Sequence, residues 1–370
     1  MEYRYYPVFR KQNMYHYDDS DIRKNISFFN EDSIIKYDYF LVNAYHYRTK
    51  TIKELTGIEE FKNVNILGDS GGFQIINGKL QEIKLLRPEI LKWLEENCNY
   101  SMILDIPPVV CDYDTALKQT IDNCKYFKSN QIGKTRFINV IHGNTYDEII
   151  KWIDNIEQFG FDGGYAIGGL VSNPNKQFKT LMTLIVLWKN GILERLNSNQ
   201  LLHILGETDT ADLILPMYFL HRINMGNFIL SSDSKYCIDL SSRNLFHTKF
   251  QNLCDKTPRK IPFKPMIECG YRCTCPICSN DYIFNNMQNG NITLTDFIYA
   301  HNHNIILNRL IEVFNISKLT YNVLKYYFKK EVLEKLKVID KIVLDKDKSN
   351  SVLKQYISLF TKTVTGRPLF

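Results

Sequence analysis

The fold of this chain is decided by a repeated pattern, and its clearest instance is Val64-Asn65-Ile66-Leu67-Gly68-Asp69. A short apolar run that ends at a turn residue is typical of a buried strand. Seven further apolar runs are each followed closely by a polar residue or a glycine. These runs cover residues 39–42, 101–104, 137–141, 165–167, 202–205, 228–230 and 266–267.

Helical patterns separate most of these runs. They cover residues 89–97, 114–128, 146–159, 177–193 and 209–222. Strands that alternate with helices at intervals of roughly 25–40 residues predict βα units and a parallel sheet. Eight such units favour a closed barrel over an open sheet, so we expect an α/β protein with a (β/α)8 TIM-barrel fold.

Polar side chains follow several of the predicted strands directly. Asp69, Asp105 and Asp233 are carboxylates at three strand ends, and His142 and Gly169 follow two other strands. In a (β/α)8 barrel the chemistry takes place at the C-terminal ends of the strands. A single strand-end aspartate is more often a helix N-cap or a turn residue. Three of them in one barrel would face a shared cavity, which favours an active site.

Four cysteines lie within ten residues, between Cys269 and Cys278. In a chain without a secretory signal, such clustering favours a metal site over disulfides. Three thiolates in a CxCxxC run with one imidazole are typical of structural zinc, although three reduced thiols in a loop are the plainer interpretation. The expected zinc ligands are Cys273, Cys275, Cys278 and His303, with His301 as the alternative to His303 and Cys269 as a further substitute.

We expect three regions in the chain. Residues 1–268 form the barrel, residues 269–304 a zinc-binding subdomain, and residues 305–370 basic C-terminal helices, with helical patterns at 294–314 and 319–342. Residues 320–370 hold 11 Lys/Arg and 5 Asp/Glu, against 46 and 40 in the whole chain, so the positive excess is C-terminal. A basic patch can contact phosphates, although a solvated helix face is the alternative.

The overall composition is that of a globular protein. Hydrophobic residues make up 44% and charged residues 23% of 370 residues, which excludes a low-complexity or wholly disordered chain. No run of about 18 apolar residues is present, so we expect no membrane span. The N-terminus lacks the apolar core of a signal peptide, and we therefore expect a cytoplasmic protein, in the host cytoplasm if a phage encodes it.

The segment Gly68-Asp69-Ser70-Gly71-Gly72-Phe73-Gln74 carries the most chemical information. An acid ends a strand, two glycines let the backbone approach a ligand, and an aromatic side chain can stack on a planar ring. This segment resembles the DSGGFQ motif of the queuine/archaeosine tRNA-guanine transglycosylase superfamily. Further segments similar to that superfamily are Leu41-Val42-Asn43-Ala44-Tyr45-His46, Leu104-Asp105, Ala166-Ile167-Gly168-Gly169-Leu170, the CxCxxC run and His303-Asn304.

The resemblance implies a base exchange in which a guanine leaves its sugar and a 7-deazaguanine replaces it. Asp233 aligns with the nucleophile that attacks C1′, Asp69 with the general acid/base, and Asp105 with the group that holds the Watson–Crick edge of the base. Two carboxylates suit the cleavage of a glycosidic bond, and the target base must be flipped out of its stack. The remaining candidates for base contacts are Ser70, Gly71, Gly72, Phe73, His142, Gly168, Gly169 and Leu170.

Two of these candidates have a structural alternative. Phe73 would stack on the base, but aromatic residues are also common in cores. His142 stands where the tRNA enzymes carry glutamine, and it either changes base recognition or is a structural histidine.

The region after Asp233 departs from the tRNA enzymes. A proline–threonine–arginine stretch that contacts the anticodon loop in those enzymes is replaced here by Ser234-Lys235-Tyr236-Cys237. The sequence is therefore most similar to the DNA-guanine transglycosylase branch, whose members insert 7-cyano-7-deazaguanine (preQ0) into DNA. The expected partners are DNA and a free 7-deazaguanine base, with a homodimer as an open possibility.

Three alternatives remain from the sequence. One is a tRNA-guanine transglycosylase that acts on an anticodon guanine, and another is an inactive, zinc-stabilised nucleic-acid-binding barrel. A metal-dependent barrel hydrolase would require histidines at several strand ends, and His142 is the one that the sequence places there.

Overall fold

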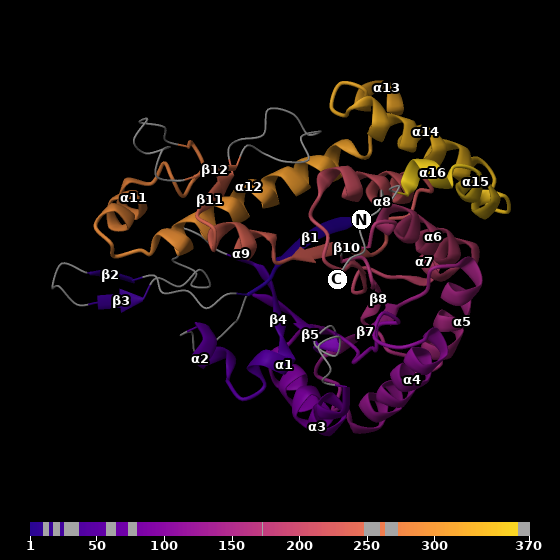
Figure 1. Cartoon of the computed structure of the whole chain (residues 1–370), viewed down its shortest axis with the longest axis horizontal. Helices are drawn as coiled ribbons and strands as arrows, with labels where there is room; N and C mark the ends of the chain where they lie inside the picture. Colours follow the sequence, from indigo (N-terminus) through magenta and orange to yellow (C-terminus); the bar gives the residue numbers. More distant parts are fainter. Residues whose placement is uncertain are drawn as a thin grey trace.

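Eight parallel strands form one sheet that curves into a nearly closed barrel (Figure 1). The computed structural model describes residues 1–9, 15–17, 23–25, 37–56, 64–72, 80–171, 173–247, 260–262 and 273–361. The predicted α/β TIM-barrel fold is confirmed. In sheet order, the strands are β1 (Glu2–Pro7), β10 (Ile229–Ser234), β9 (Leu201–Ile204), β8 (Gly164–Ile167), β7 (Arg136–Ile141), β6 (Tyr100–Met102), β5 (Asn65–Asp69) and β4 (Tyr39–Asn43).

The first and last strands of this order, β1 and β4, meet just beyond the end of β1. Val8 and Leu41 form a parallel bridge, and the backbone N–H of Phe9 donates to the carbonyl of Leu41 at 2.7 Å. The barrel therefore closes between its N-terminal strand and the next barrel strand in the sequence.

One member of the expected set of strands differs. β1 completes the barrel in place of the strand expected at residues 266–267, which lie outside the described residues. The N-terminal run is rich in tyrosine, whose ring is apolar and whose hydroxyl is polar, so the run does not stand out as hydrophobic. Tyr5 and Tyr6 are buried in the barrel, and tyrosine has a high preference for strands.

Helices on the outside of the barrel connect the strands (Figure 1). Local sequence signals fix where they begin: Asp112 and Asp209 cap their helices through the side chain, and Thr145 with Glu148 forms a capping box. These helices are α3 (Leu80–Asn97), α4 (Tyr113–Asn130), α5 (Tyr146–Glu157), α6 (Lys176–Lys189), α7 (Ile192–Arg195) and α8 (Thr210–Arg222).

The helix expected at residues 177–193 is divided into α6 and α7. Gly191 adopts a left-handed backbone conformation with a φ of 66°, which interrupts the helical hydrogen bonding. The central part of α6, from Phe178 to Trp188, is buried. This helix is therefore covered on its outer side as well as by the barrel.

A helical region follows the barrel, as expected. Its helices are α9 (Tyr236–Ser241), α11 (Asp281–Gln288), α12 (Leu294–Ile316), α13 (Tyr321–Leu324), α14 (Lys330–Leu344), α15 (Ser349–Gln355) and α16 (Ile357–Phe360). The single helix expected at residues 319–342 is thus divided into α13 and α14.

This region packs on the barrel through several contacts, among them those of α12 and α14. In α12, Phe314 stacks on Tyr3 of β1 with ring centroids 5.7 Å apart. In α14, Asp340 accepts hydrogen bonds from Tyr218 of α8 at 2.9 and 3.0 Å and pairs with Arg222 at 2.8 Å. Figure 1 shows α12 running across one side of the barrel and α13 to α16 following from its end.

The remaining described elements are short. They are α1 (Ala44–Tyr47), α2 (Ile52–Thr56), and two antiparallel pairs, β2 (Tyr15–Tyr17) with β3 (Arg23–Asn25) and β11 (Leu245–His247) with β12 (Lys260–Pro262). Among the residues that the structure describes, no helix combines the length and the apolar character that a bilayer crossing requires.

Candidate active site

Asp69 is the last residue of β5, at the end of the barrel where the predicted site residues gather. Its Oδ2 accepts a hydrogen bond from Asn43 Nδ2 at 2.5 Å, and its Oδ1 accepts one from the N–H of Gly71 at 2.9 Å. Burial raises the pKa of Asp69 to about 6, and the negative charges of Asp105 and Asp233 contribute to the increase. Asp69 therefore lies close enough to both other carboxylates for their charges to act on it.

Asp105 lies three residues beyond β6 and pairs with a buried histidine. His142, directly after β7, places its Nε2 at 2.6 Å from Asp105 Oδ2. Burial lowers the pKa of His142, and this effect exceeds the opposing effect of the Asp105 carboxylate. The imidazole is therefore neutral, and the nitrogen that faces the carboxylate carries the proton because a carboxylate only accepts.

The opposite nitrogen of His142 has no such partner. The Nδ1 atom is buried, and within the described residues it makes no hydrogen bond. The ring is held edge-on against Trp152, with centroids 5.0 Å apart. His142 thus combines a positioning contact to Asp105 with an unused acceptor.

Asp233 lies in β10, and two groups hold the same oxygen of its carboxylate. Gly206, just beyond β9, donates its N–H to Oδ1 at 2.7 Å, and His203 Nε2 lies 3.0 Å from the same atom. The hydroxyl of Ser231 is 2.9 Å from His203 Nδ1 and completes the orientation of the ring. Within the described residues Oδ2 has no hydrogen-bond partner, so one carboxylate oxygen is held and the other is available.

His203 was not predicted from the sequence as a site residue. It lies inside the predicted apolar run 202–205, where a histidine is easily interpreted as part of the core, and in the structure it belongs to β9. The available signal was its place in a barrel strand, because alternate residues of such a strand point into the barrel.

The remaining predicted base contacts differ in position. Ser70 is fully buried and donates its hydroxyl to the carbonyl of Ile103 at 2.9 Å, which ties the ends of β5 and β6 together. Gly72 lies so close to Asp105 that a Cβ there would be 2.6 Å from the Asp105 carbonyl oxygen. A larger residue at position 72 would therefore displace Asp105. Phe73 lies outside the described residues.

The segment 168–170 follows β8 and borders the same mouth. Gly168 packs against the His142 ring, Gly169 is exposed with a φ of 67°, and Leu170 is buried. Lys179 of α6 reaches this segment, because a Cβ added to Gly169 would lie 2.6 Å from Lys179 Nζ. The sequence analysis did not single out Lys179.

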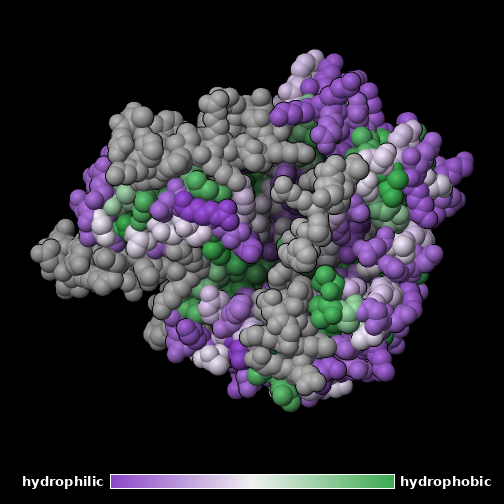
Figure 2. Space-filling view, viewed as in Figure 1, coloured by the Kyte–Doolittle hydropathy of each residue, from purple (hydrophilic) through white to green (hydrophobic). Residues whose placement is uncertain are grey.

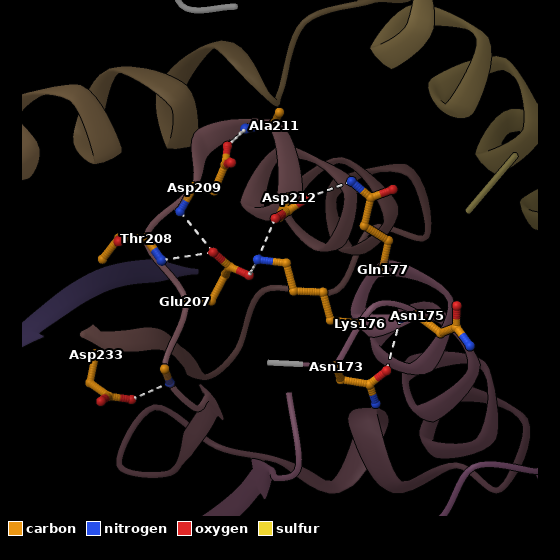
Figure 3. A network of polar contacts seen from close by, with 11 residues as sticks. Asn173, Asn175, Lys176, Gln177, Glu207, Thr208, Asp209, Ala211, Asp212 and Asp233 are labelled. Atoms are coloured by element: carbon orange, nitrogen blue, oxygen red, sulfur yellow. Dashed lines mark hydrogen bonds and ion pairs between the residues drawn. The ribbon is translucent and has the colours of Figure 1, made fainter. Parts of the chain in front are cut away.

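A second polar network supports the loop that holds Asp233. Glu207 accepts hydrogen bonds from the N–H groups of Thr208 and Asp209 at 3.0 and 2.8 Å. Lys176 Nζ lies 2.6 Å from both Glu207 and Asp212 (Figure 3). Figure 3 also shows Asp233 facing the backbone of this loop. Burial and the nearby Asp212 raise the pKa of Glu207, while Lys176 opposes that increase.

The cysteine cluster lies outside the barrel and forms a separate site. The side chains of Cys273, Cys275, Cys278 and His301 are buried, and their donor atoms all lie within 4.8 Å of one another. His301 Nδ1 is 3.2 Å from the sulfur of Cys275 and 3.3 Å from that of Cys278. These four side chains could bind a metal ion.

The structure thus groups the alternative fourth ligand, His301, with the three cysteines, and the preferred choice, His303, is not part of this group. Successive helical residues are rotated by about 100°, so two histidines two positions apart face nearly opposite sides of α12. The His303 ring stacks on Tyr5 and contacts the edge of Tyr37 instead, with centroids 5.7 and 4.1 Å away.

In the described part of the chain, the cysteine cluster is the only group of three or more His, Cys, Asp or Glu side chains arranged to hold a metal ion. His142 and His203 each pair with a different aspartate, so the strand ends do not combine them into a metal site. A metal-dependent hydrolase at the barrel mouth is not favoured by this arrangement.

Searches with the whole chain found no matching family model and no matching curated protein. The fold and the site described above therefore carry the functional argument alone.

Proposed function

We propose that this protein is a DNA-guanine transglycosylase that exchanges guanine in DNA for a 7-deazaguanine base of the preQ0 type. The observation that carries the proposal is the meeting of Asp69, Asp105 and Asp233 at the ends of three barrel strands, close enough for their charges to interact. Two carboxylates for a glycosidic bond and a third for the donor edge of guanine are the set that this reaction requires.

The first half of the proposed reaction breaks the bond between C1′ and N9 of guanine. The available Oδ2 of Asp233 forms an ester bond to C1′, and the electron pair of the broken bond leaves with the base. Asp69 supplies the proton that the departing base takes up, which its raised pKa of about 6 favours. His203 and Gly206 fix the other oxygen of Asp233, so the attacking oxygen is oriented.

The second half reverses these steps with a different base. Asp69, now a carboxylate, removes the N9 proton of the incoming 7-deazaguanine, and N9 forms a bond to C1′ as the ester bond to Asp233 breaks. The strand is not cut, because both steps act at C1′ and break no phosphodiester bond, and the ester to Asp233 prevents release of an abasic sugar between them. In both halves Asp105 accepts hydrogen bonds from N1–H and the N2 amino group of the base, while His142 holds its carboxylate in place.

Two features favour DNA over tRNA as the substrate. The chain lacks the basic stretch after Asp233 with which the similar tRNA enzymes contact an anticodon loop. Its positive excess lies in residues 320–370 instead, and α14 alone holds four lysines. Figure 2 shows mainly hydrophilic side chains where α13 and α14 lie. Lysine side chains on such helices can neutralise phosphates along a duplex.

The metal ion that fits the cysteine cluster best is zinc. In a tetrahedral site with Zn–S of about 2.3 Å and Zn–N of about 2.0 Å, sulfur and nitrogen lie about 3.5 Å apart. The S···N distances of 3.2 and 3.3 Å at His301 are close to this value. Four protein ligands leave no position for water, so we assign the ion a folding role and no part in the exchange.

An exchange assay with radiolabelled guanine tests the proposal. The full chain is incubated with duplex DNA, single-stranded DNA or unfractionated tRNA, and retained label is measured. We expect label in DNA and none in tRNA. Label retained in tRNA but not in DNA would replace the DNA assignment with the tRNA one, and label in neither would contradict the exchange reaction.

A second assay tests the covalent step. Wild-type protein incubated with DNA should give an adduct that survives denaturing electrophoresis, whereas Asp233→Asn should give none. Asp239→Asn serves as the matched control, because Asp239 lies six residues further on in α9. An adduct of equal yield in Asp233→Asn would exclude Asp233 as the nucleophile.

A further inference from the structure

Lys179 is a buried amine with no hydrogen-bond partner for its Nζ among the described residues. It lies in the first turn of α6, and only 6% of the residue is exposed. Burial lowers the pKa of Lys179 to about 8, and the distant attraction of Glu148 only partly offsets this. A lysine that is mostly buried, with no protein partner for its amine, is costly to maintain, which points to a ligand that completes its contacts.

The Nζ atom of Lys179 packs against the backbone of Gly169. Gly169 is exposed, and a Cβ placed on it would lie 2.6 Å from Lys179 Nζ and 3.5 Å from His142 Nδ1, so any larger residue there would displace the lysine. His142 Nδ1 is itself buried without a hydrogen-bond partner among the described residues. Two nitrogen atoms with unused hydrogen-bonding capacity thus lie on either side of the exposed Gly169.

These two nitrogen atoms lie next to the carboxylate that we propose binds the base. His142 connects Asp105 to Lys179, because its Nε2 contacts Asp105 and its Nδ1 lies beside Gly169, as Lys179 Nζ does. Along the mouth, the order of groups is therefore an acceptor at Asp105, an acceptor at the neutral His142, and a cationic donor at Lys179. Around the edge of a guanine-type base, the N2 amino group and N1–H are donors. The O6 acceptor comes next, and the 7-substituent follows it.

We infer that Lys179 is a specificity-determining residue, whose ammonium group donates to an acceptor at O6 or on the 7-substituent of the base and repels a base with a cationic substituent. This inference rests on the proposed function, because Asp105 orients the base as described above. It assigns the substrate class as neutral guanine-type bases. A nitrile offers a neutral acceptor to Lys179, whereas an aminomethyl group would bring a second positive charge into a buried site.

Binding of free bases by the full chain tests the inference without requiring the exchange chemistry. Calorimetry compares guanine, 7-deazaguanine, 7-cyano-7-deazaguanine and 7-aminomethyl-7-deazaguanine on wild type and on Lys179→Met. Lys189→Met is the matched control, since Lys189 ends the same helix and contacts Asp347 instead. We expect the wild type to bind the aminomethyl base at least 10-fold more weakly than the cyano base. Lys179→Met should lose this discrimination, and its affinity for the neutral bases should fall by about 10-fold or more.

The pattern of losses identifies the acceptor. A loss of similar size for guanine, 7-deazaguanine and the cyano base places the contact at O6, and a loss confined to the cyano base places it at the 7-substituent. Lys179→Gln keeps a donor but removes the charge, so it should abolish the discrimination with a smaller loss of affinity. This second variant also serves if Lys179→Met does not fold.

Two outcomes would overturn the inference. If wild type binds guanine-type bases and the Lys179 variants bind all four with unchanged affinities, Lys179 has no role in recognition, while the proposed exchange function stands. If wild type binds none of the four bases, the proposed function fails and the inference fails with it.

Discussion

His203 Nε2 lies 3.0 Å from Asp233 Oδ1, and Gly206 donates its N–H to the same oxygen. Among the described residues, the other oxygen of this carboxylate, Oδ2, has no hydrogen-bond partner. The hydroxyl of Ser231 fixes the other side of the His203 ring. A carboxylate held by one oxygen in this way is oriented before any substrate binds, and preorganised groups react faster than mobile ones.

Replacing His203 should therefore slow the formation of the covalent adduct. His203→Leu removes the donor, and we expect the single-turnover rate of adduct formation to fall about 10- to 100-fold, because a hydrogen bond to a charged group contributes about 1.5–3 kcal/mol. His203→Gln places an amide N–H near the position of Nε2 and should recover most of the rate. Equal rates in His203→Leu and wild type would contradict a positioning role.

The raised pKa of Asp69 makes a prediction about stability against pH. Its folded-state pKa of about 6 lies above the ordinary value of 3.8, so between these pH values the folded protein binds a proton that the unfolded chain has lost. Stability therefore decreases as pH rises through this window, and the full cost is present above about pH 6. Asp69→Asn removes an ionisation that costs about 1–3 kcal/mol.

Chemical denaturation at pH 4 and pH 8 measures this effect. We expect Asp69→Asn to be stabilised relative to wild type at pH 8 and to show little or no gain at pH 4. Asp114→Asn is the control, since its exposed carboxylate pairs only with Lys151 on the surface. A gain of the same size at both pH values would show that Asp69 is not the titrating group.

The sequence predicted those parts of the fold that local patterns determine. Seven of the eight strands follow from short apolar runs, and the helices between them follow from helical patterns such as those at residues 146–159 and 209–222. Thr145 and Asp209 cap two of these helices in the structure. β1 could not be predicted in this way, because its partner β10 lies more than 220 residues away, as the pairing of Tyr3 with Leu230 shows. Tyrosine hydroxyls also weaken its apolar signal, while its rings still fill the barrel.

In the candidate site too, some features follow from local sequence patterns and others depend on long-range packing. Strand-end carboxylates are visible in the sequence because each follows an apolar run, and the barrel topology alone brings them to one end. Whether His301 or His303 faces the cysteines depends on how α12 packs. In the structure, the rings of Tyr5 and Tyr37 contact His303. Lys179 was hidden because a lysine in a helical pattern is normally solvated, and its burial depends on the neighbouring Gly169.

The network around Glu207 predicts a stability defect with a specific rescue. Lys176→Met leaves the buried carboxylate of Glu207 and that of Asp212 without their shared cation. Breaking a buried ion pair on one side costs about 3 kcal/mol. Combining it with Glu207→Gln should restore most of this loss, because the amide oxygen still accepts from Thr208 and Asp209. Urea denaturation of the single and double variants measures both steps, and a double variant less stable than Lys176→Met would contradict the pairing.

The metal site gives a prediction that separates its two neighbouring histidines. His301 stacks on Phe246 with centroids 3.4 Å apart, and His303 stacks on Tyr5, so phenylalanine preserves a ring at either position and removes the ligand nitrogen. We expect about one zinc per chain in wild type and in His303→Phe by elemental analysis, and a strong loss of zinc in His301→Phe. Chelation should lower the melting temperature of wild type and His303→Phe, and affect His301→Phe little. Retention of zinc by His301→Phe together with its loss from His303→Phe would show that His303 is the ligand after all.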